Sequence, residues 1–221
     1  MLTIITRTSN RPALFRRLRE SIQNQTINQN EIYHLILADN LESYQYAFEI
    51  LNQGVDYKKE DPLPAARVSL VQKPNSNGRG FYNLYLNEGV EIVANGWIMF
   101  VDDDDYLVNN YCLQEVVDIL KDESRFYIIQ FLRGTKVKPP ESLFAKHQYR
   151  AGDTSPIVSG KIGSSCIIVP ATMAKKARWD DGLGADYRYI RDLALQFPYS
   201  FYPIPVVQAT KKGNKGKNIH Q

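Results

Sequence analysis

A run of apolar residues that ends abruptly in four carboxylates constrains the fold of this chain most strongly. Residues 97–101 read WIMFV, and Asp102, Asp103, Asp104 and Asp105 follow directly. A short run of β-branched and aromatic residues predicts a buried strand. Four adjacent carboxylates repel one another, so they require a cation, basic neighbours or full solvation. An acidic run alone is more typical of a solvated turn. Its place after a buried strand favours a site for Mg²⁺ or Mn²⁺, which prefer oxygen ligands and bridge carboxylates to phosphates.

Strands and helices alternate over the first hundred residues. Buried strands are predicted at residues 2–6, 32–38, 68–71 and 97–101, and helices after Pro12, after Ser43 and over residues 81–93. This alternation predicts an α/β fold with a mostly parallel central sheet and helices on both faces. Such sheets bind ligands beyond the carboxyl ends of their strands. The polar turns at residues 7–11, 39 and 102–105 all follow strand ends, so we expect them at one edge.

The second half of the sequence is less regular. It predicts a helix capped by Asn109, a strand at 126–132, a long loop at 133–160 that is a candidate lid, a strand at 164–169, and helices at 171–177 and 186–197. Pro203 and Pro205 interrupt a last strand at 199–207. Because proline cannot donate a backbone hydrogen bond, we expect this strand at the edge of the sheet. Since no linker or internal repeat is visible, residues 1–221 are expected to form one domain.

Composition limits the classes of function. The 221 residues carry a formal net charge of only +3, which argues against a nucleic-acid-binding protein. No apolar run is long enough for a transmembrane helix, and no secretory signal precedes the first strand. Cys112 and Cys166 fall in a predicted helix and strand, where buried thiols of a reducing compartment are more typical than a disulfide. We therefore expect a cytoplasmic protein. Its lysines at 211–217 are candidates for peripheral contact with a membrane.

Two stretches resemble family 2 glycosyltransferases of the GT-A fold. Residues 4–12 (IITRTSNRP) resemble the opening of that family. Residues 94–105 (ANGWIMFVDDDD), after Asn87 and Gly89, resemble the stretch that leads into its D-x-D motif. The resemblance implies an inverting transfer of a sugar from a nucleotide-diphosphate sugar, with a UDP-sugar favoured, to an acceptor hydroxyl, with Mn²⁺ or Mg²⁺ as cofactor. The acceptor would be a glycan, a lipid-linked molecule or a protein, in glycan or polysaccharide synthesis. About residues 1–105 would form the donor-binding half and about 106–221 the acceptor-binding half.

The resemblance also implies roles for the acidic residues. Asp102 matches the first aspartate of the motif, near the ribose or the metal, and Asp104 matches the metal ligand at the diphosphate. Asp103 is the variable position and either contacts the donor or faces solvent, whereas Asp105 supports either the acceptor side or the residues that bind the metal. Asp39 matches the acidic position that contacts the base or ribose, although an Asp-Asn pair also suits a turn or a helix cap.

Basic and hydroxyl residues complete the implied donor site. Thr6 and Arg7 would lie near the nucleotide, although the family often has Pro-Thr-Tyr-Asn where this chain reads TRTSN. Arg79 would approach the nucleotide or its sugar, or belong to a flexible turn. Arg11 would contact a phosphate or lie solvated. His220 matches a late histidine that serves as a metal ligand in some enzymes of this fold, and the tail lysines near it would neutralise the diphosphate or lie solvated.

Asp186 resembles the acidic residue that acts as general base in inverting members of the family. Such a base takes the proton of the acceptor hydroxyl as that hydroxyl attacks the anomeric carbon. Ala185 stands where glutamate is usual in the family, and Asp186 is also suited to capping its helix. Asp180 and Asp181 are acidic alternatives nearby.

Several other classes of protein lack their motifs here. The sequence contains no phosphate-binding loop of the Gly-x-x-x-x-Gly-Lys-Ser/Thr type and no Gly-x-Gly-x-x-Gly after the first strand. Tyr106 stands where a phosphatase with an aspartate nucleophile needs threonine. The remaining alternative to an enzyme is a non-catalytic module that binds carbohydrate or metal through the acidic loop.

Overall fold

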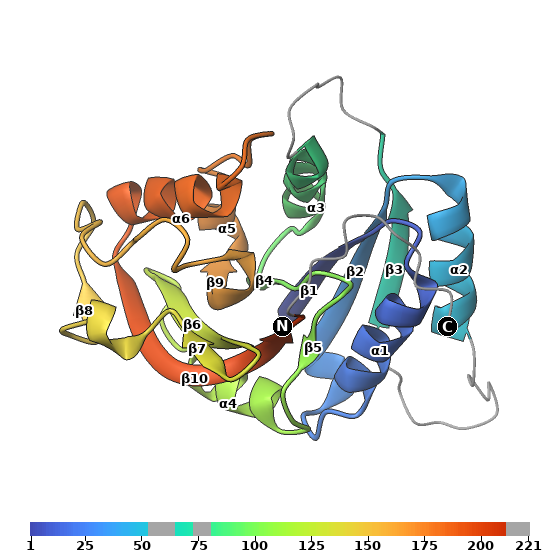
Figure 1. The fold of residues 1–221 in the computed structure, drawn as a ribbon, viewed down its shortest axis with the longest axis horizontal. Coiled ribbons are helices and arrows are strands. Elements are labelled where there is room, and N and C mark those ends of the chain that lie inside the picture. Colours follow the sequence, from blue (N-terminus) through green and yellow to red (C-terminus); the bar gives the residue numbers. More distant parts are fainter. Residues whose placement is uncertain (53–64, 73–80, 211–221) are drawn as a thin grey trace.

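The computed structural model describes residues 1–52, 65–72 and 81–210. These residues form one mixed sheet with helices on both faces (Figure 1). The strands are β1 (Leu2–Thr8), β2 (Ile32–Ala38), β3 (Ala65–Leu70), β4 (Trp97–Phe100), β5 (Tyr106–Leu107), β6 (Phe126–Arg133), β7 (Lys136–Lys138), β8 (Gln148–Tyr149), β9 (Ile167–Pro170) and β10 (Tyr199–Ala209). The helices are α1 (Pro12–Gln23), α2 (Leu41–Asn52), α3 (Tyr85–Ile92), α4 (Cys112–Ile119), α5 (Ala171–Ala174) and α6 (Ala185–Gln196).

The sheet has the strand order β3-β2-β1-β4-β9-β6-β10-β5, with β7 beside β6 and β8 beside β10. Strands β3, β2, β1 and β4 are parallel neighbours, as the alternation of strands and helices predicts. Strand β9 runs antiparallel to both β4 and β6, and β10 runs parallel to β6. The predicted α/β fold with a mostly parallel central sheet is therefore confirmed.

Alternate residues of the central strands face opposite sides of the sheet. Ile5 and Phe100 pack in a core with α3, α5 and α6, which lie above the sheet in Figure 1. Ile4 and Met99 pack in a second core with α1 and α4 on the opposite side. This two-residue period explains why the central strands read as continuous apolar runs, since both of their faces are covered.

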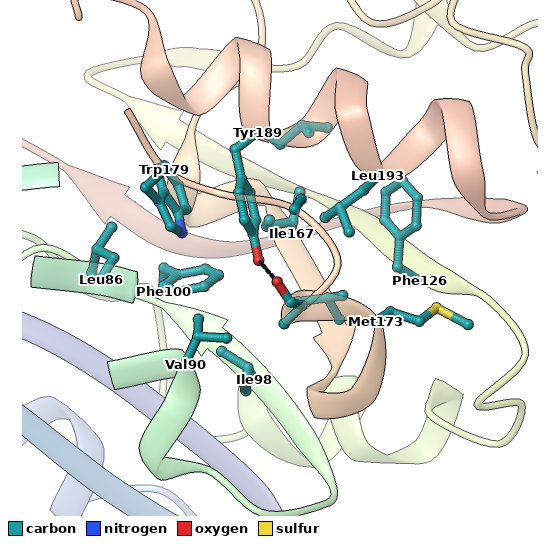
Figure 2. Packing of buried hydrophobic residues seen from close by; sticks show 14 of the residues in the cluster. Leu86, Val90, Ile98, Phe100, Phe126, Ile167, Met173, Trp179, Tyr189 and Leu193 are labelled. Carbon is teal, nitrogen blue, oxygen red and sulfur yellow. Dashed lines mark hydrogen bonds between the residues drawn. The ribbon is translucent and has the colours of Figure 1, made fainter. Parts of the chain in front are cut away.

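The first core attaches α6 to the strand that precedes the acidic run (Figure 2). Trp179 and Tyr189 stack with ring centroids 4.2 Å apart, and the Phe100 ring of β4 meets both rings at steep angles. The Tyr189 hydroxyl donates a hydrogen bond of 3.1 Å to the Ala174 carbonyl. The side chain of Asn87 in α3 exchanges two hydrogen bonds with the backbone of Trp179. These contacts fix the start of α6 relative to β4.

Gly89 lets α3 lie directly on the sheet. A Cβ atom at this position would meet Leu37 Cδ1 at 2.8 Å and Ile5 Cγ2 at 3.0 Å. Those distances are too short for carbon atoms in contact, so a side chain would push α3 away from β1 and β2. The glycine therefore sets the depth at which α3 packs.

The expectation that the last strand lies at the sheet edge is wrong. Strand β10 is paired on one side with β6 and on the other with β8 and β5. The register against β6 shifts on either side of Pro205, and these shifts accommodate the missing proline amides inside the sheet. The prolines therefore mark an irregular ladder, not an edge.

Several other predicted boundaries also change. Residues 133–160, expected as a long loop, contain β7 and β8, and Phe144 stacks on Phe201 of β10 with ring centroids 3.9 Å apart. Asn109 does not cap a helix, because α4 begins at Cys112. The helix expected at 81–93 begins as a 3₁₀ turn, η2 (Phe81–Leu84), and the strand expected at 164–169 begins as a second one, η4 (Ser164–Cys166).

Two expectations from composition can be compared with the described residues. Cys112 and Cys166 are both free and buried, as predicted. Among the residues that the structure describes, none of the helices combines the length and apolar character needed to span a membrane.

Candidate active site

Three parallel strands bring the predicted donor residues to one edge of the sheet. Strands β2, β1 and β4 are neighbours and run parallel, so their carboxyl ends meet at the same edge. Arg7 lies near the end of β1, Asp39 directly follows β2, and residues 102–105 come just after β4. The placement expected from the sequence is therefore confirmed. Arg79, His220 and the tail lysines lie outside the described residues.

Three carboxylates of the acidic run converge at this edge. One oxygen atom from each of Asp102, Asp104 and Asp105 lies within 4.8 Å of the others. Asp105 accepts hydrogen bonds from Ser165 Oγ at 3.4 Å and from the Thr210 amide at 3.1 Å. Burial, followed by repulsion from Asp102 and Asp104, raises the pKa of Asp105 to about 8. A bound cation would favour the ionised form of these carboxylates. Such an oxygen-rich cluster fits Mg²⁺ or Mn²⁺.

Arg7 joins the acidic run to the 3₁₀ turn before α3. Its Nε and one terminal nitrogen each lie 3.0 Å from Asp102 Oδ1. Its other terminal nitrogen donates to Asn83 Oδ1, and the guanidinium lies over the Tyr82 ring, 4.5 Å from the centroid. The side chains of Arg7 and Asp102 remain 15% and 30% exposed, so a ligand in solution can reach both.

Asp103 turns inward, away from solvent. Its side chain is fully buried and accepts hydrogen bonds from Thr8 Oγ1 at 2.7 Å and from Arg11 Nε at 3.1 Å, and a terminal nitrogen of Arg11 pairs with its other oxygen. Burial raises the pKa of Asp103 to about 7, although Arg11 and Thr8 oppose the shift. Two alternatives from the sequence are therefore wrong: Asp103 does not face solvent, and Arg11 is ion-paired, not merely solvated.

Asp186 lies in the first turn of α6, within electrostatic reach of Asp102 and Arg7. The N-cap of this helix is Gly184, so Asp186 does not occupy the capping position, although its Oδ1 accepts a 2.8 Å hydrogen bond from the Tyr187 amide. Burial raises the pKa of Asp186, Asp102 raises it further, and Arg7 opposes the shift. The Asp186 carboxylate is therefore close enough to Asp102 and Arg7 for both charges to act on its pKa. The alternative acid Asp180 is instead engaged with Arg188.

Asp39 and Thr6 have different surroundings at the ends of their strands. Asp39 is half-buried and accepts a 2.6 Å hydrogen bond from the Asn40 side chain. Asn40 Oδ1 accepts from the Ser43 amide at 2.8 Å, so Asn40 caps α2 and the Asp39 carboxylate is not the cap. The Thr6 hydroxyl is fully buried, 3.0 Å from His34 Nε2, so it does not reach the edge of the sheet.

Sequence reasoning missed several residues that hold these side chains. Asn83 and Tyr82 contact Arg7, and Ser165 and Thr210 hold Asp105, but none of the four belongs to a recognisable motif. Each comes from a distant part of the chain, so sequence spacing carries no signal of the contact. Thr8 could have been identified from the sequence, because it follows Arg7 at the carboxyl end of the predicted strand.

No family model matches this sequence, and no curated protein matches it. Solved structures match over nearly the whole chain. TarS 1–349 from S. aureus has a TM-score of 0.70 at 18% identity, over 95% of this chain and 60% of TarS 1–349. Its complex with UDP-GlcNAc has a TM-score of 0.65 at 18% identity, over 96% and 58% of the two chains. The mannosyltransferase PcManGT from Pyrobaculum calidifontis, in complex with GDP-Man and Mn²⁺, has a TM-score of 0.65 at 12% identity, over 97% and 58%.

The chain thus spans about three fifths of the length of these three structures. At these identities the likeness concerns the fold and not the substrates. Each match covers at least 95% of this chain, so it extends through both of its halves. The chain therefore has a GT-A-like glycosyltransferase fold, as the resemblance of its motifs predicts.

Proposed function

We propose that this protein is a metal-dependent glycosyltransferase that moves a sugar from a nucleotide-diphosphate sugar to an acceptor hydroxyl. One observation carries the proposal: Asp102, Asp104 and Asp105 converge at the carboxyl edge of a GT-A-like sheet, and the charge of Asp102 acts on Asp186. Sheets of this kind bind ligands at that edge. Structures of TarS with UDP-GlcNAc and with UDP support a UDP-sugar as the favoured donor.

In this proposal Arg7, Asp39 and Asp102 contact the nucleotide part of the donor. All three lie at the carboxyl edge, and none is fully buried. Arg79 remains a proposed contact that lies outside the described residues. Because the side chains of Thr6 and Asp103 are fully buried and hydrogen-bonded, we assign them to the support of the site and not to donor contact.

Asp104, together with Asp102 and Asp105, would hold Mn²⁺ or Mg²⁺. The bound cation would neutralise the departing nucleoside diphosphate and so act as a Lewis acid. The complex of PcManGT with GDP-Man and Mn²⁺ supports this choice of ion. His220 remains a proposed further ligand. The position of Thr210 at Asp105, ten residues before His220 in the sequence, is consistent with that role.

Asp186 would act as the general base toward the acceptor. Its raised pKa keeps the carboxylate basic enough to accept the proton of the attacking hydroxyl, and the Tyr187 amide fixes one of its oxygens. Attack from the side opposite the departing diphosphate would invert the anomeric carbon. The proposed acceptor is a glycan, a lipid-linked molecule or a protein, bound by the half of the single domain formed by about residues 106–221, in glycan or polysaccharide synthesis.

A thermal-shift screen of nucleoside diphosphates and nucleotide sugars, with and without Mn²⁺, tests the proposal. Ligands that bind only the native state raise the melting temperature by mass action. We expect a Mn²⁺-dependent shift with UDP or UDP-sugars in the wild-type protein and none in Asp104→Ala. Absence of a shift with every nucleotide, in a protein that unfolds cooperatively, would refute the proposal. Donor binding without sugar transfer to any acceptor would instead indicate a non-catalytic binding module.

A further inference from the structure

The second residue of the acidic run differs from its neighbours in its surroundings. Asp103 is fully buried, whereas Asp102 is partly exposed at the edge of the sheet. Both oxygens of Asp103 are engaged, because Arg11 Nε and Thr8 Oγ1 bond Oδ2 and a terminal nitrogen of Arg11 pairs with Oδ1. Buried carboxylates persist when they are paired in this way, so Asp103 and Arg11 form one structural unit.

The guanidinium of Arg11 pairs with two adjacent carboxylates, those of Asp103 and Asp104. The Nε and one terminal nitrogen of Arg11 face Asp103, and its remaining terminal nitrogen lies 3.3 Å from Asp104 Oδ2. The guanidinium is planar and presents its donors in a fixed fork. The two-point pair with Asp103 therefore fixes how far the remaining nitrogen reaches toward Asp104.

The hydroxyls of Thr8 and Tyr46 hold the pair from the other side. Thr8 Oγ1 donates to Asp103 and also contacts the Tyr46 hydroxyl of α2, which accepts a 3.4 Å hydrogen bond from the Arg11 amide. The contacts close a ring that links the end of β1, the start of α1 and α2. Such a closed network preorganises the charged groups that it contains.

We propose that Asp103 is a positioning residue that engages the Arg11 fork, so that Asp104 keeps an oxygen free for a divalent cation. The inference rests on the proposed function, since it takes Asp104 as a metal ligand. If Asp103 lost its charge, the guanidinium would turn to Asp104, the nearest remaining carboxylate, and form a two-point pair there. Arg11 and the cation would then compete for the same oxygens.

A Mn²⁺ titration followed by electron paramagnetic resonance, with and without UDP, tests the inference in three variants. Asp103→Asn keeps the shape of the side chain but removes its charge, and we expect ~10- to 100-fold weaker Mn²⁺ binding. The double variant Asp103→Asn/Arg11→Gln also removes the guanidinium that competes with Mn²⁺. Its Mn²⁺ affinity should therefore return to within about threefold of wild type. Asp122→Asn breaks the Asp122–Arg125 pair far along the chain and serves as the matched control with unchanged affinity.

Two results would overturn the inference: wild-type affinity in Asp103→Asn, or a double variant as weak as the single one. A merely structural role of Asp103 would lower the melting temperature of both variants and leave the Mn²⁺ affinity of the folded protein unchanged. Failure of the wild-type protein to bind Mn²⁺ would refute the proposed metal site and the inference with it. If Asp103→Asn does not fold, Asp103→Ser also removes the charge; weaker Mn²⁺ binding is expected there, and unchanged affinity overturns the inference.

Discussion

The guanidinium of Arg7 lies against Asp102, with Nε and one terminal nitrogen each 3.0 Å from Asp102 Oδ1. The same pair acts on the proposed base. Burial raises the pKa of Asp186, the Asp102 carboxylate adds to that shift, and Arg7 opposes it. The Arg7 guanidinium, near the end of β1, therefore influences both Asp102 on the donor side and the proposed base Asp186.

Replacement of Arg7 by alanine should move the pH dependence of sugar transfer. The base must be ionised to accept a proton, so the rate falls as the pH drops through the pKa of Asp186. Removal of the positive charge of Arg7 raises the pKa of Asp186 further, so the acidic limb of the profile should shift to higher pH. The measurement is kcat against pH under saturating donor, compared between wild type and Arg7→Ala.

Arg7→Lys provides the control for this shift. Lysine keeps the positive charge but cannot place two nitrogens on one carboxylate oxygen while a third contacts Asn83. The acidic limb should therefore stay near its wild-type position, whereas the KM for the donor should rise. An unchanged acidic limb in Arg7→Ala would contradict the electrostatic coupling of Arg7 to Asp186.

Asp186→Asn should separate donor binding from chemistry. The amide keeps the size of the carboxylate and can still accept the hydrogen bond from the Tyr187 amide, but it cannot take a proton. We expect transfer to slow by roughly 10²- to 10⁴-fold, with donor affinity unchanged in calorimetry. Asp180→Asn is the comparison, because Asp180 is paired with Arg188 and should lose far less activity. Near-normal transfer in Asp186→Asn would exclude the base role.

The sequence predicted the parallel strands of the first half and their common edge, because these features depend on local patterns. Apolar runs at residues 2–6, 32–38 and 97–101 each end at a polar turn, and parallel pairing then places the turns at one edge. The same reasoning could not predict β10. Its pairing partners β6 and β8 are set by the long-range packing of Phe144, Tyr149 and Phe201, which no local pattern describes.

The site shows the same division between local and long-range information. Asp102 and Asp104 were recognised from the motif, and the structure places them together. The inward turn of Asp103 was missed, because it depends on an arginine about ninety positions earlier in the chain. Ion pairs of this kind follow from the three-dimensional arrangement of β1, α1 and β4, so one sequence without its relatives does not reveal them.

Gly89→Ala should destabilise the protein although alanine favours helices. The helix preference of alanine is worth about 1 kcal/mol, but the new methyl group would meet Leu37 Cδ1 at 2.8 Å, and overpacking of this kind costs roughly 1–3 kcal/mol. We expect a lower urea midpoint. Glu88→Ala, at the neighbouring exposed position, changes helix preference without the clash and should leave the midpoint near wild type. A more stable Gly89→Ala would show that α3 can shift freely on the sheet.

The pKa of Asp105 predicts an unusual dependence of stability on pH. Burial and the neighbouring carboxylates raise this pKa to about 8, whereas the unfolded chain has the ordinary value of 3.8. Between these values the folded state binds more protons, so the unfolding free energy falls as the pH rises, by at most about 1.4 kcal/mol per pH unit for one group. Urea unfolding from pH 4 to 8 in EDTA measures this slope.

Asp105→Asn isolates that contribution, because Asp103 titrates in both proteins. The variant should lose stability less steeply with rising pH, and at pH 8 it should be more stable than wild type in EDTA. Addition of Mn²⁺ at pH 8 should raise the unfolding free energy of the wild type, since bound metal holds Asp105 ionised, and should do so much less in Asp105→Asn. Parallel pH profiles for the two proteins would show that Asp105 ionises normally in the folded state, and an equal gain from Mn²⁺ would place the cation away from Asp105.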